Sequence, residues 1–137
     1  MTELVALKQA LAAAQAVVYG YGVAGAHLSG KDRKLAAARL VGYEQLRDQI
    51  SALISGSGAV AAPAQPAYRL PFPVADAAAA RRLAAQLESA ACGVAWDLCA
   101  AAGSRSSARA LAVGWLSDAS VTAARWGSPV PALPGRS

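Results

Sequence analysis

Apolar residues recur at alternating intervals of three and four near the start of the chain, and this spacing predicts one helix over residues 2–28. The repeating positions are Leu4, Leu7, Leu11, Ala14, Val18, Tyr21, Gly25 and Leu28. Thr2 stands where a helix cap is expected, and Ser29 and Gly30 stand where glycine commonly ends a helix. One side of this helix is therefore expected to face a core along its whole length.

Three further helices follow from the same kind of pattern. The second is predicted over residues 32–55, with Asp32 as its cap. The third starts after Asp76 and runs to Ala102, and the fourth covers residues 106–126. The positions expected to face inward in these three helices are Ala36, Leu40, Tyr43, Ile50, Ile54, Leu83, Leu87, Val94, Leu98, Leu111, Trp115 and Leu116.

The connection between the second and third helices, residues 56–75, is rich in proline and long for a compact domain. Its apolar residues Tyr68, Leu70, Phe72 and Val74 suggest a segment lying extended along the helices. Two tight hairpins joined by one long crossover have the connectivity of a ferritin-like four-helix bundle. We therefore predict an all-α fold, with a single ferritin-like domain over residues 1–126 and an extended tail over residues 127–137.

No charged residue lies between Lys8 and Lys31. This span is long enough to cross a bilayer, but it is mostly Ala and Gly and no basic segment precedes it, so a buried helix in a soluble protein is favoured. A glycine inside a helix costs about 1 kcal/mol relative to alanine. Gly20, Gly22 and Gly25 therefore predict close packing between helices.

The composition narrows the class of partner. Charged residues make up 15% of the 137 positions, and the formal net charge of +5 is spread along the chain without a dense basic run, so nucleic acid is not an expected partner. Low surface charge, together with exposed tryptophans among Trp96, Trp115 and Trp126, favours a homo-oligomer. Cys92 and Cys99 lie too far apart on one helix for a disulfide, which favours a reducing compartment, the cytoplasm.

Four polar residues fall at the same height in the predicted bundle. Gln15, Glu44, Glu88 and Asp118 each lie about 22 Å from the nearer helix turn. A ferritin-like di-iron site would occupy this height, with a Glu from each of two helices and Glu-x-x-His from each of the other two. Neither Glu44 nor Asp118 is followed by that histidine, and the single histidine, His27, lies near a helix end. No metal-ligand set, catalytic set or cofactor is predicted.

Each of these polar residues also has a structural interpretation. Gln15 fits a hydrogen-bonded buried amide, and Glu44 fits a solvated position beside the apolar seam. Glu88 and Asp118 are expected to be hydrogen-bonded or paired with arginines, because a bare buried carboxylate is costly. Tyr43 is expected in the core, with its hydroxyl reaching Glu88 or Asp118.

Several short motifs carry a family resemblance. They are Val18-Tyr19-Gly20-Tyr21-Gly22, Arg47-Asp48, Tyr68-Arg69-Leu70-Pro71-Phe72-Pro73, Leu87-Glu88 and Ala124-Arg125-Trp126. With this set, nearly the whole chain resembles the actinobacterial ferritin-like domain family of unknown function. The resemblance implies a ferritin-like four-helix fold and supplies no established activity.

The resemblance also points to a set of site positions. Members of that family commonly carry Glu-His just before the Tyr-Gly-Tyr-Gly stretch, a His in the second helix and a Glu in each of the last two helices. The matching positions here are Ala14, Gln15, Tyr43, Glu88 and Asp118, of which only the last two keep a carboxylate. With the neighbouring Glu44, these residues are the candidates for the remnant of a mid-bundle site.

Two functions from different classes follow. The first is a non-catalytic ferritin-like bundle that serves as a binding or structural module, as a homo-oligomer. The second is a metal-dependent oxidoreductase or iron-handling protein with a degenerate site. A small apolar ligand held between the helices near Ala14, Gly20 and Gly22 is a third possibility. An enzyme is the less favoured class, and neither a membrane nor nucleic acid is expected as a partner.

Overall fold

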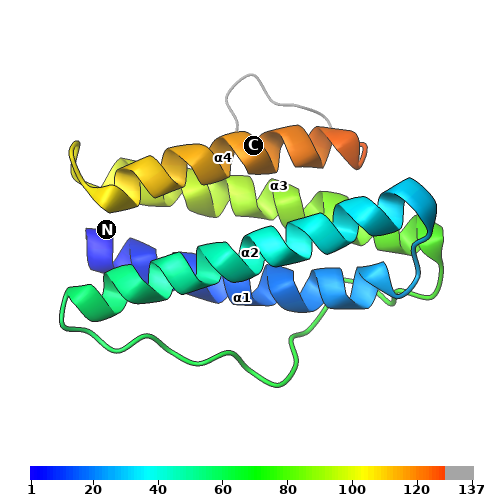
Figure 1. The fold of residues 1–137 in the computed structure, drawn as a ribbon, viewed down its shortest axis with the longest axis horizontal. Coiled ribbons are helices and arrows are strands. Elements are labelled where there is room, and N and C mark those ends of the chain that lie inside the picture. Colours follow the sequence, from blue (N-terminus) through cyan, green and yellow to red (C-terminus); the bar gives the residue numbers. More distant parts are fainter. Residues whose placement is uncertain (129–137) are drawn as a thin grey trace.

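Four helices make up the regular secondary structure of residues 1–128, the part of the chain that the computed structural model describes (Figure 1). They are α1 (Glu3–Gly25), α2 (Gly30–Gly56), α3 (Ala77–Ala101) and α4 (Ser107–Arg125). The predicted all-α class is confirmed. The largest difference in helix bounds is the end of α1, predicted at Leu28 and found at Gly25. Most of the predicted tail, residues 129–137, lies outside the described residues.

Side-chain caps fix the starts of three helices. The Thr2 hydroxyl accepts a hydrogen bond from the Val5 amide at 3.1 Å, as predicted for the start of α1. The Asp76 carboxylate accepts from the Ala79 amide at 2.8 Å at the start of α3, and Ser106 caps α4 in the same way. These caps satisfy backbone donors that no helical carbonyl can reach.

The prediction that Asp32 caps α2 is wrong. The helix begins earlier, at Gly30, and Ser29 occupies the cap position. Gly30 adopts a positive φ of 58°, which glycine tolerates, so the chain turns there and enters the helix at once. Asp32 lies in the first turn of α2 and approaches Arg81 at 3.5 Å.

The helices form two antiparallel hairpins whose turns lie at opposite ends of the bundle (Figure 1). The connection between α2 and α3 runs along the bundle from one end to the other, beside α1 (Figure 1). Helix α1 packs closely on α2 and α3, and α3 packs closely on α4. Helices α2 and α4 make fewer close approaches, and a groove separates them.

The crossover lies against the bundle as its apolar residues suggested. Tyr68, Leu70, Phe72 and Val74 are all half-buried. The Gln15 amide on α1 donates a hydrogen bond to the Ala62 carbonyl at 2.9 Å, and the Tyr19 and Tyr68 rings meet at 5.7 Å between centroids. The crossover is therefore attached to α1 by polar and aromatic contacts.

The glycines of α1 do not share one cause. A Cβ built on Gly20 would lie 2.5 Å from the nearest Leu87 methyl carbon, so close packing explains this glycine as predicted. Gly22 and Gly25 would meet nothing within 4 Å, so the same prediction is wrong for them. Leu87 fills the space beside Gly20, and Gly22 is exposed.

Candidate functional site

Glu88 lies near the middle of α3 and is completely buried, with 0% of its surface exposed. Its carboxylate accepts four hydrogen bonds. Oε2 accepts from the Tyr21 hydroxyl at 2.6 Å and from Arg39 Nε at 2.7 Å. Oε1 accepts from the Tyr43 hydroxyl at 2.6 Å and from Arg39 Nη2 at 3.1 Å. A charge that would be costly to bury alone is thus paired and fully hydrogen-bonded.

A tryptophan supports each tyrosine. Trp126 Nε1 donates to the Tyr21 hydroxyl at 3.0 Å, and Trp115 Nε1 donates to the Tyr43 hydroxyl at 3.1 Å. Two Trp–Tyr chains therefore end on the two oxygens of one carboxylate. We call Tyr21, Arg39, Tyr43, Glu88, Trp115 and Trp126 the Glu88 network.

Every helix contributes to the Glu88 network. Tyr21 comes from α1, Glu88 from α3, and Arg39 and Tyr43 from α2, one helical turn apart. Trp115 lies within α4 and Trp126 is its C-terminal cap residue. Because the tyrosines and tryptophans belong to the buried core, the network joins the four helices at the centre of the bundle.

The electrostatics of the network keep its donors protonated. Burial, followed by the negative charge of Glu88, raises the pKa of Tyr21 and Tyr43 well above the ordinary tyrosine value. Burial lowers the pKa of Arg39, but the hydrogen bond and charge of Glu88 outweigh it and raise the pKa overall. The Arg39 guanidinium also lies over the Tyr43 ring, 5.0 Å from its centroid. The network therefore holds one anion, one cation and two neutral hydroxyls.

The structure places only two of the six predicted site residues together, Tyr43 and Glu88. The Tyr43 hydroxyl reaches Glu88, one of its two expected partners. Ala14 is fully buried in the apolar core, and the Gln15 amide is occupied by the crossover carbonyl. Asp118 is exposed, so its expected burial against an arginine is wrong.

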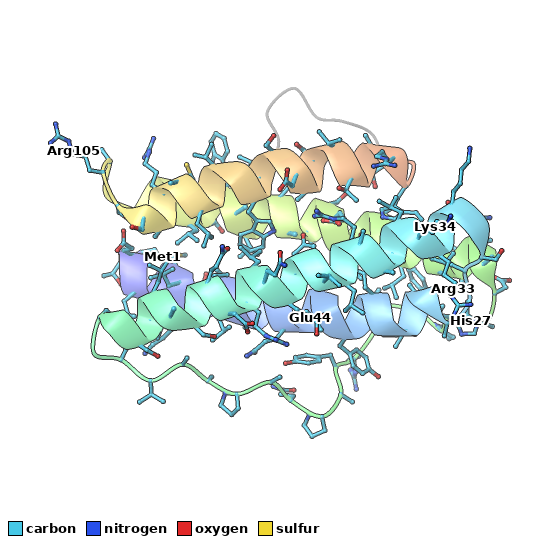
Figure 2. All side chains as sticks on the ribbon, viewed as in Figure 1. Met1, His27, Arg33, Lys34, Glu44 and Arg105 are labelled. Atoms are coloured by element: carbon cyan, nitrogen blue, oxygen red, sulfur yellow. The ribbon has the colours of Figure 1, made fainter. Side chains whose placement is uncertain are left out.

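Glu44 and the single histidine also lie apart from each other. Glu44 is half-buried on the middle of α2, whereas His27 lies at the end of the bundle near Arg33 and Lys34 (Figure 2). Met1 and Arg105 mark the opposite end (Figure 2). The residues named as a remnant site therefore do not converge on one point.

Sequence reasoning did not single out Arg39 or Tyr21 as partners of Glu88. Arg39 lies four residues before Tyr43 and three after Ala36, so its spacing placed it on the inward face of α2. Tyr21 lies on the apolar seam of α1, where a buried hydroxyl needs a partner. Trp115 was expected to face inward and is buried, and Trp126, one of the tryptophans considered for exposure, is also buried; both are hydrogen-bonded.

A groove of about 650 Å³ runs between α2 and α4 over one edge of the network. Tyr43 and Trp115 line it together with leucines from both helices. The remaining lining residues include Arg39, Gly42, Gln45, Gln49, Ala110, Gly114 and Asp118. The groove thus has an apolar floor and few charges.

The two cysteines are free thiols. Cys92 is buried, and burial followed by the charge of Glu88 raises the pKa of its thiol, which favours the unreactive neutral form. Cys99 is half-buried. Neither takes part in the Glu88 network.

Comparison with known proteins settles the family. The model of the family described as "Domain of unknown function (DUF4439)" matches residues 6–137. The chain belongs to the DUF4439 family. A solved structure, the conserved hypothetical protein rv2844 from Mycobacterium tuberculosis, is similar to this DUF4439 chain with a TM-score of 0.84 and 30% identity. The similarity covers 90% of this chain and 93% of that one. No curated protein matches.

The DUF4439 family has no known function, and the neighbour is itself described as hypothetical, so neither assigns an activity to this chain. Among residues 1–128, no helix is both long and apolar enough to cross a membrane. The inward side of the charge-free segment of α1 belongs to the buried core, with Leu11, Ala14 and Tyr21 among its residues.

Proposed function

We propose that this protein is a ferritin-like bundle without catalytic activity that serves as a structural or binding module. The order of its helices supports the ferritin-like assignment. Two antiparallel hairpins joined by a crossover that runs the length of the bundle have the connectivity of ferritin-like proteins. The long crossover between α2 and α3 distinguishes this arrangement from bundles with three short loops.

The main support for the proposal is that the Glu88 carboxylate already accepts hydrogen bonds from four donors within the chain. A carboxylate offers about four lone-pair positions, and four donors occupy them here. A metal ion bound by Glu88 would have to displace at least one donor and would then meet the positive charge of Arg39. The Arg39 guanidinium thus provides the cationic partner that a metal provides to the carboxylates of a di-iron bundle.

The alternative, an iron-handling protein or metal-dependent oxidoreductase, is less well supported. No three His, Cys, Asp or Glu side chains within residues 1–128 gather closely enough to hold a metal ion. Ala14 offers no ligand atom, and Asp118 lies exposed at the groove. The chemistry available at the network is therefore hydrogen bonding and ion pairing, which fits a structural role.

Metal analysis of the full chain tests the proposal. After anaerobic loading with Fe(II) or Mn(II) and removal of free metal, we expect below about a tenth of an equivalent to remain bound, since no preformed ligand set is available. Glu88→Gln should leave this residual amount unchanged, as should the matched Glu44→Gln. Stoichiometric metal that Glu88→Gln removes and Glu44→Gln retains would overturn the proposal.

A further inference from the structure

The bundle is closed on three of its sides and open on the fourth. Helix α1 packs closely on α2 and α3, and α3 packs closely on α4, whereas the groove of about 650 Å³ separates α2 from α4. A volume of this size is typical of sites that bind small molecules, and the space between the helices of a bundle is a common place for them. The open side therefore offers room for a ligand.

The groove has a charged end and an apolar end. Helices α2 and α4 run antiparallel (Figure 1), and the hydrogen bond from Trp115 Nε1 to the Tyr43 hydroxyl fixes their register. Counting along both helices from this pair puts Arg39 on α2 at the level of Asp118 on α4. These two are the charged residues of the lining. Toward the other end, the apolar lining residues are Leu46, Ala52, Leu53, Ala110 and Leu111.

Arg39 and Asp118 both keep unused hydrogen-bonding capacity at the charged end. Arg39 donates from Nε and Nη2 to Glu88, and within residues 1–128 its Nη1 donates to no other residue. The Asp118 carboxylate is exposed and belongs to none of the ion pairs in the described part of the chain. Because Glu88 neutralises Arg39, a ligand there would meet the negative charge of Asp118 together with the free N–H groups of Nη1.

The polar atoms on the floor of the groove are already satisfied. The Tyr43 hydroxyl donates to Glu88 and accepts from the Trp115 indole, which uses its single donor in this way. Specific polar recognition is therefore confined to the end of the groove that carries Arg39 and Asp118. A ligand that fits would have one polar end and one apolar end.

Two glycines keep the middle of the groove open. Gly42 precedes Tyr43 and Gly114 precedes Trp115, and both glycines line the groove. A Cβ built on either would meet nothing within 4 Å, so packing within the chain requires neither. Glycine lowers the stability of a helix relative to alanine. A ligand that lies across these two positions would account for both glycines.

We propose that the α2–α4 groove binds a single-chain cationic amphiphile. Its ammonium group pairs with Asp118, an oxygen beside the ammonium accepts from Arg39 Nη1, and its apolar chain lies along the leucines. Between the levels of Asp118 and Ser107, α4 runs about 17 Å, which suits a straight chain of medium length such as a decyl group. An anionic head would meet the like charge of Asp118. This assignment rests on the binding role proposed above and gives the class of its ligand.

Isothermal titration calorimetry of the full chain tests the ligand class. The probes are decylammonium, decanoate and an aminodecanol whose hydroxyl lies on the carbon beside the ammonium-bearing carbon, all below their micelle concentrations. We expect decylammonium to bind one-to-one with a Kd of about 100 µM. The aminodecanol should bind about threefold more tightly through Arg39, and decanoate about tenfold more weakly than decylammonium. Absence of binding by both amines, or decanoate binding as tightly as decylammonium, would overturn the proposal.

Variants with matched controls test the two ends of the contact. Asp118→Asn should weaken decylammonium binding about fivefold, whereas Asp97→Asn, an exposed carboxylate on α3, should not change it. Gly42→Leu should weaken it more than about tenfold by filling the groove, and Gly22→Leu on α1 is its control. Added atoms at either glycine start in open space, so circular dichroism should show both variants folded. Equal affinities within either pair would contradict the assigned site.

Backbone amide NMR locates the site independently of affinity. Decylammonium should shift the signals of Gly42 and Gly114 and leave those of Gly22 and Gly25 in place, and the opposite pattern would overturn the proposal. Shifts of Gly42 and Gly114 that follow protein concentration without any probe would show a second copy in the groove and would also overturn it. Metal content does not depend on the groove. Failure of the non-catalytic assignment would therefore appear as bound metal, and failure of this one as missing amphiphile binding.

Discussion

The guanidinium of Arg39 spans both carboxylate oxygens of Glu88, with Nε 2.7 Å from Oε2 and Nη2 3.1 Å from Oε1. The Glu88 side chain is fully buried, whereas the Arg39 side chain keeps 17% of its surface exposed. The pair is therefore held at the boundary between the core and the α2–α4 groove. Removing either charge would leave the other without its partner in a poorly solvated position.

Glu88→Gln should lower the free energy of unfolding by about 3 kcal/mol, near the lower end for a broken buried pair because Arg39 keeps some contact with water. The amide preserves the shape of the side chain but turns one acceptor into a donor. Urea unfolding followed by circular dichroism measures the change. Asp48→Asn is the matched control, since the Arg47–Asp48 pair is largely exposed and should change stability by less than about 1 kcal/mol. An equal effect from both variants would contradict the role assigned to Glu88.

Tyr21→Phe and Tyr43→Phe should each destabilise the protein by about 2 kcal/mol. Each removes a hydrogen bond to a charged acceptor and leaves a buried tryptophan N–H without its acceptor. Tyr68→Phe provides a control, because the Tyr68 hydroxyl accepts its hydrogen bond from the exposed backbone N–H of Gln65 in the crossover. If Tyr21→Phe and Tyr68→Phe cost the same, the inner hydroxyls add nothing specific to stability.

The raised pKa of Tyr21 and Tyr43 predicts a loss of stability in alkali. Above pH 10, tyrosines of the unfolded chain release protons that the folded chain retains, so the free energy of unfolding falls as pH rises. Below the ordinary tyrosine pKa this contribution is fully present. Unfolding in urea between pH 8 and pH 11 measures the slope. The double variant Tyr21→Phe/Tyr43→Phe should show a shallower slope than Tyr19→Phe/Tyr68→Phe, and identical slopes would refute the assignment.

Gly22→Ala should raise the free energy of unfolding by about 1 kcal/mol, because Gly22 is an exposed helix position where a methyl group meets nothing. Gly20→Ala gains the same helix propensity but must displace the Leu87 methyl groups. Its net effect should be lower by about 1–2 kcal/mol. Thermal unfolding of the two variants side by side gives the difference, and equal stabilities would show that Leu87 moves away without cost.

The helices and their order could be predicted because their signals are local. The apolar spacing, the caps Thr2 and Asp76 and the proline-rich crossover each act over a few residues, and the structure agrees with them. The prediction of the α1–α2 turn was less accurate, because α1 ends at Gly25 and α2 begins at Gly30. Gly30 can serve either to end one helix or to begin the next, and its role depends on backbone geometry that the sequence pattern leaves open.

The candidate site was only partly predictable. Counting residues from the turns gives height in the bundle, and this brought attention to Glu88 and Gln15 at the same level. Height does not give the direction in which a side chain points, so Gln15 bonds the crossover while Glu88 points inward. Arg39 was not among the candidate residues, although its spacing from Ala36 and Tyr43 puts it near the inward face of α2. Its pairing depends on Tyr21 and Glu88, which are distant in sequence.

The Glu88 network also bears on how the chain folds. Its hydrogen bonds join residues 45 to 105 positions apart, and neither hairpin contains all of its members. The α3–α4 hairpin alone would hold the carboxylate without its arginine, and the α1–α2 hairpin alone would hold the arginine without its carboxylate. Each half would carry an uncompensated charge on the surface that it must bury. Stable intermediates made of one hairpin are thereby disfavoured, and the four helices are expected to gain and lose their structure in a single cooperative transition.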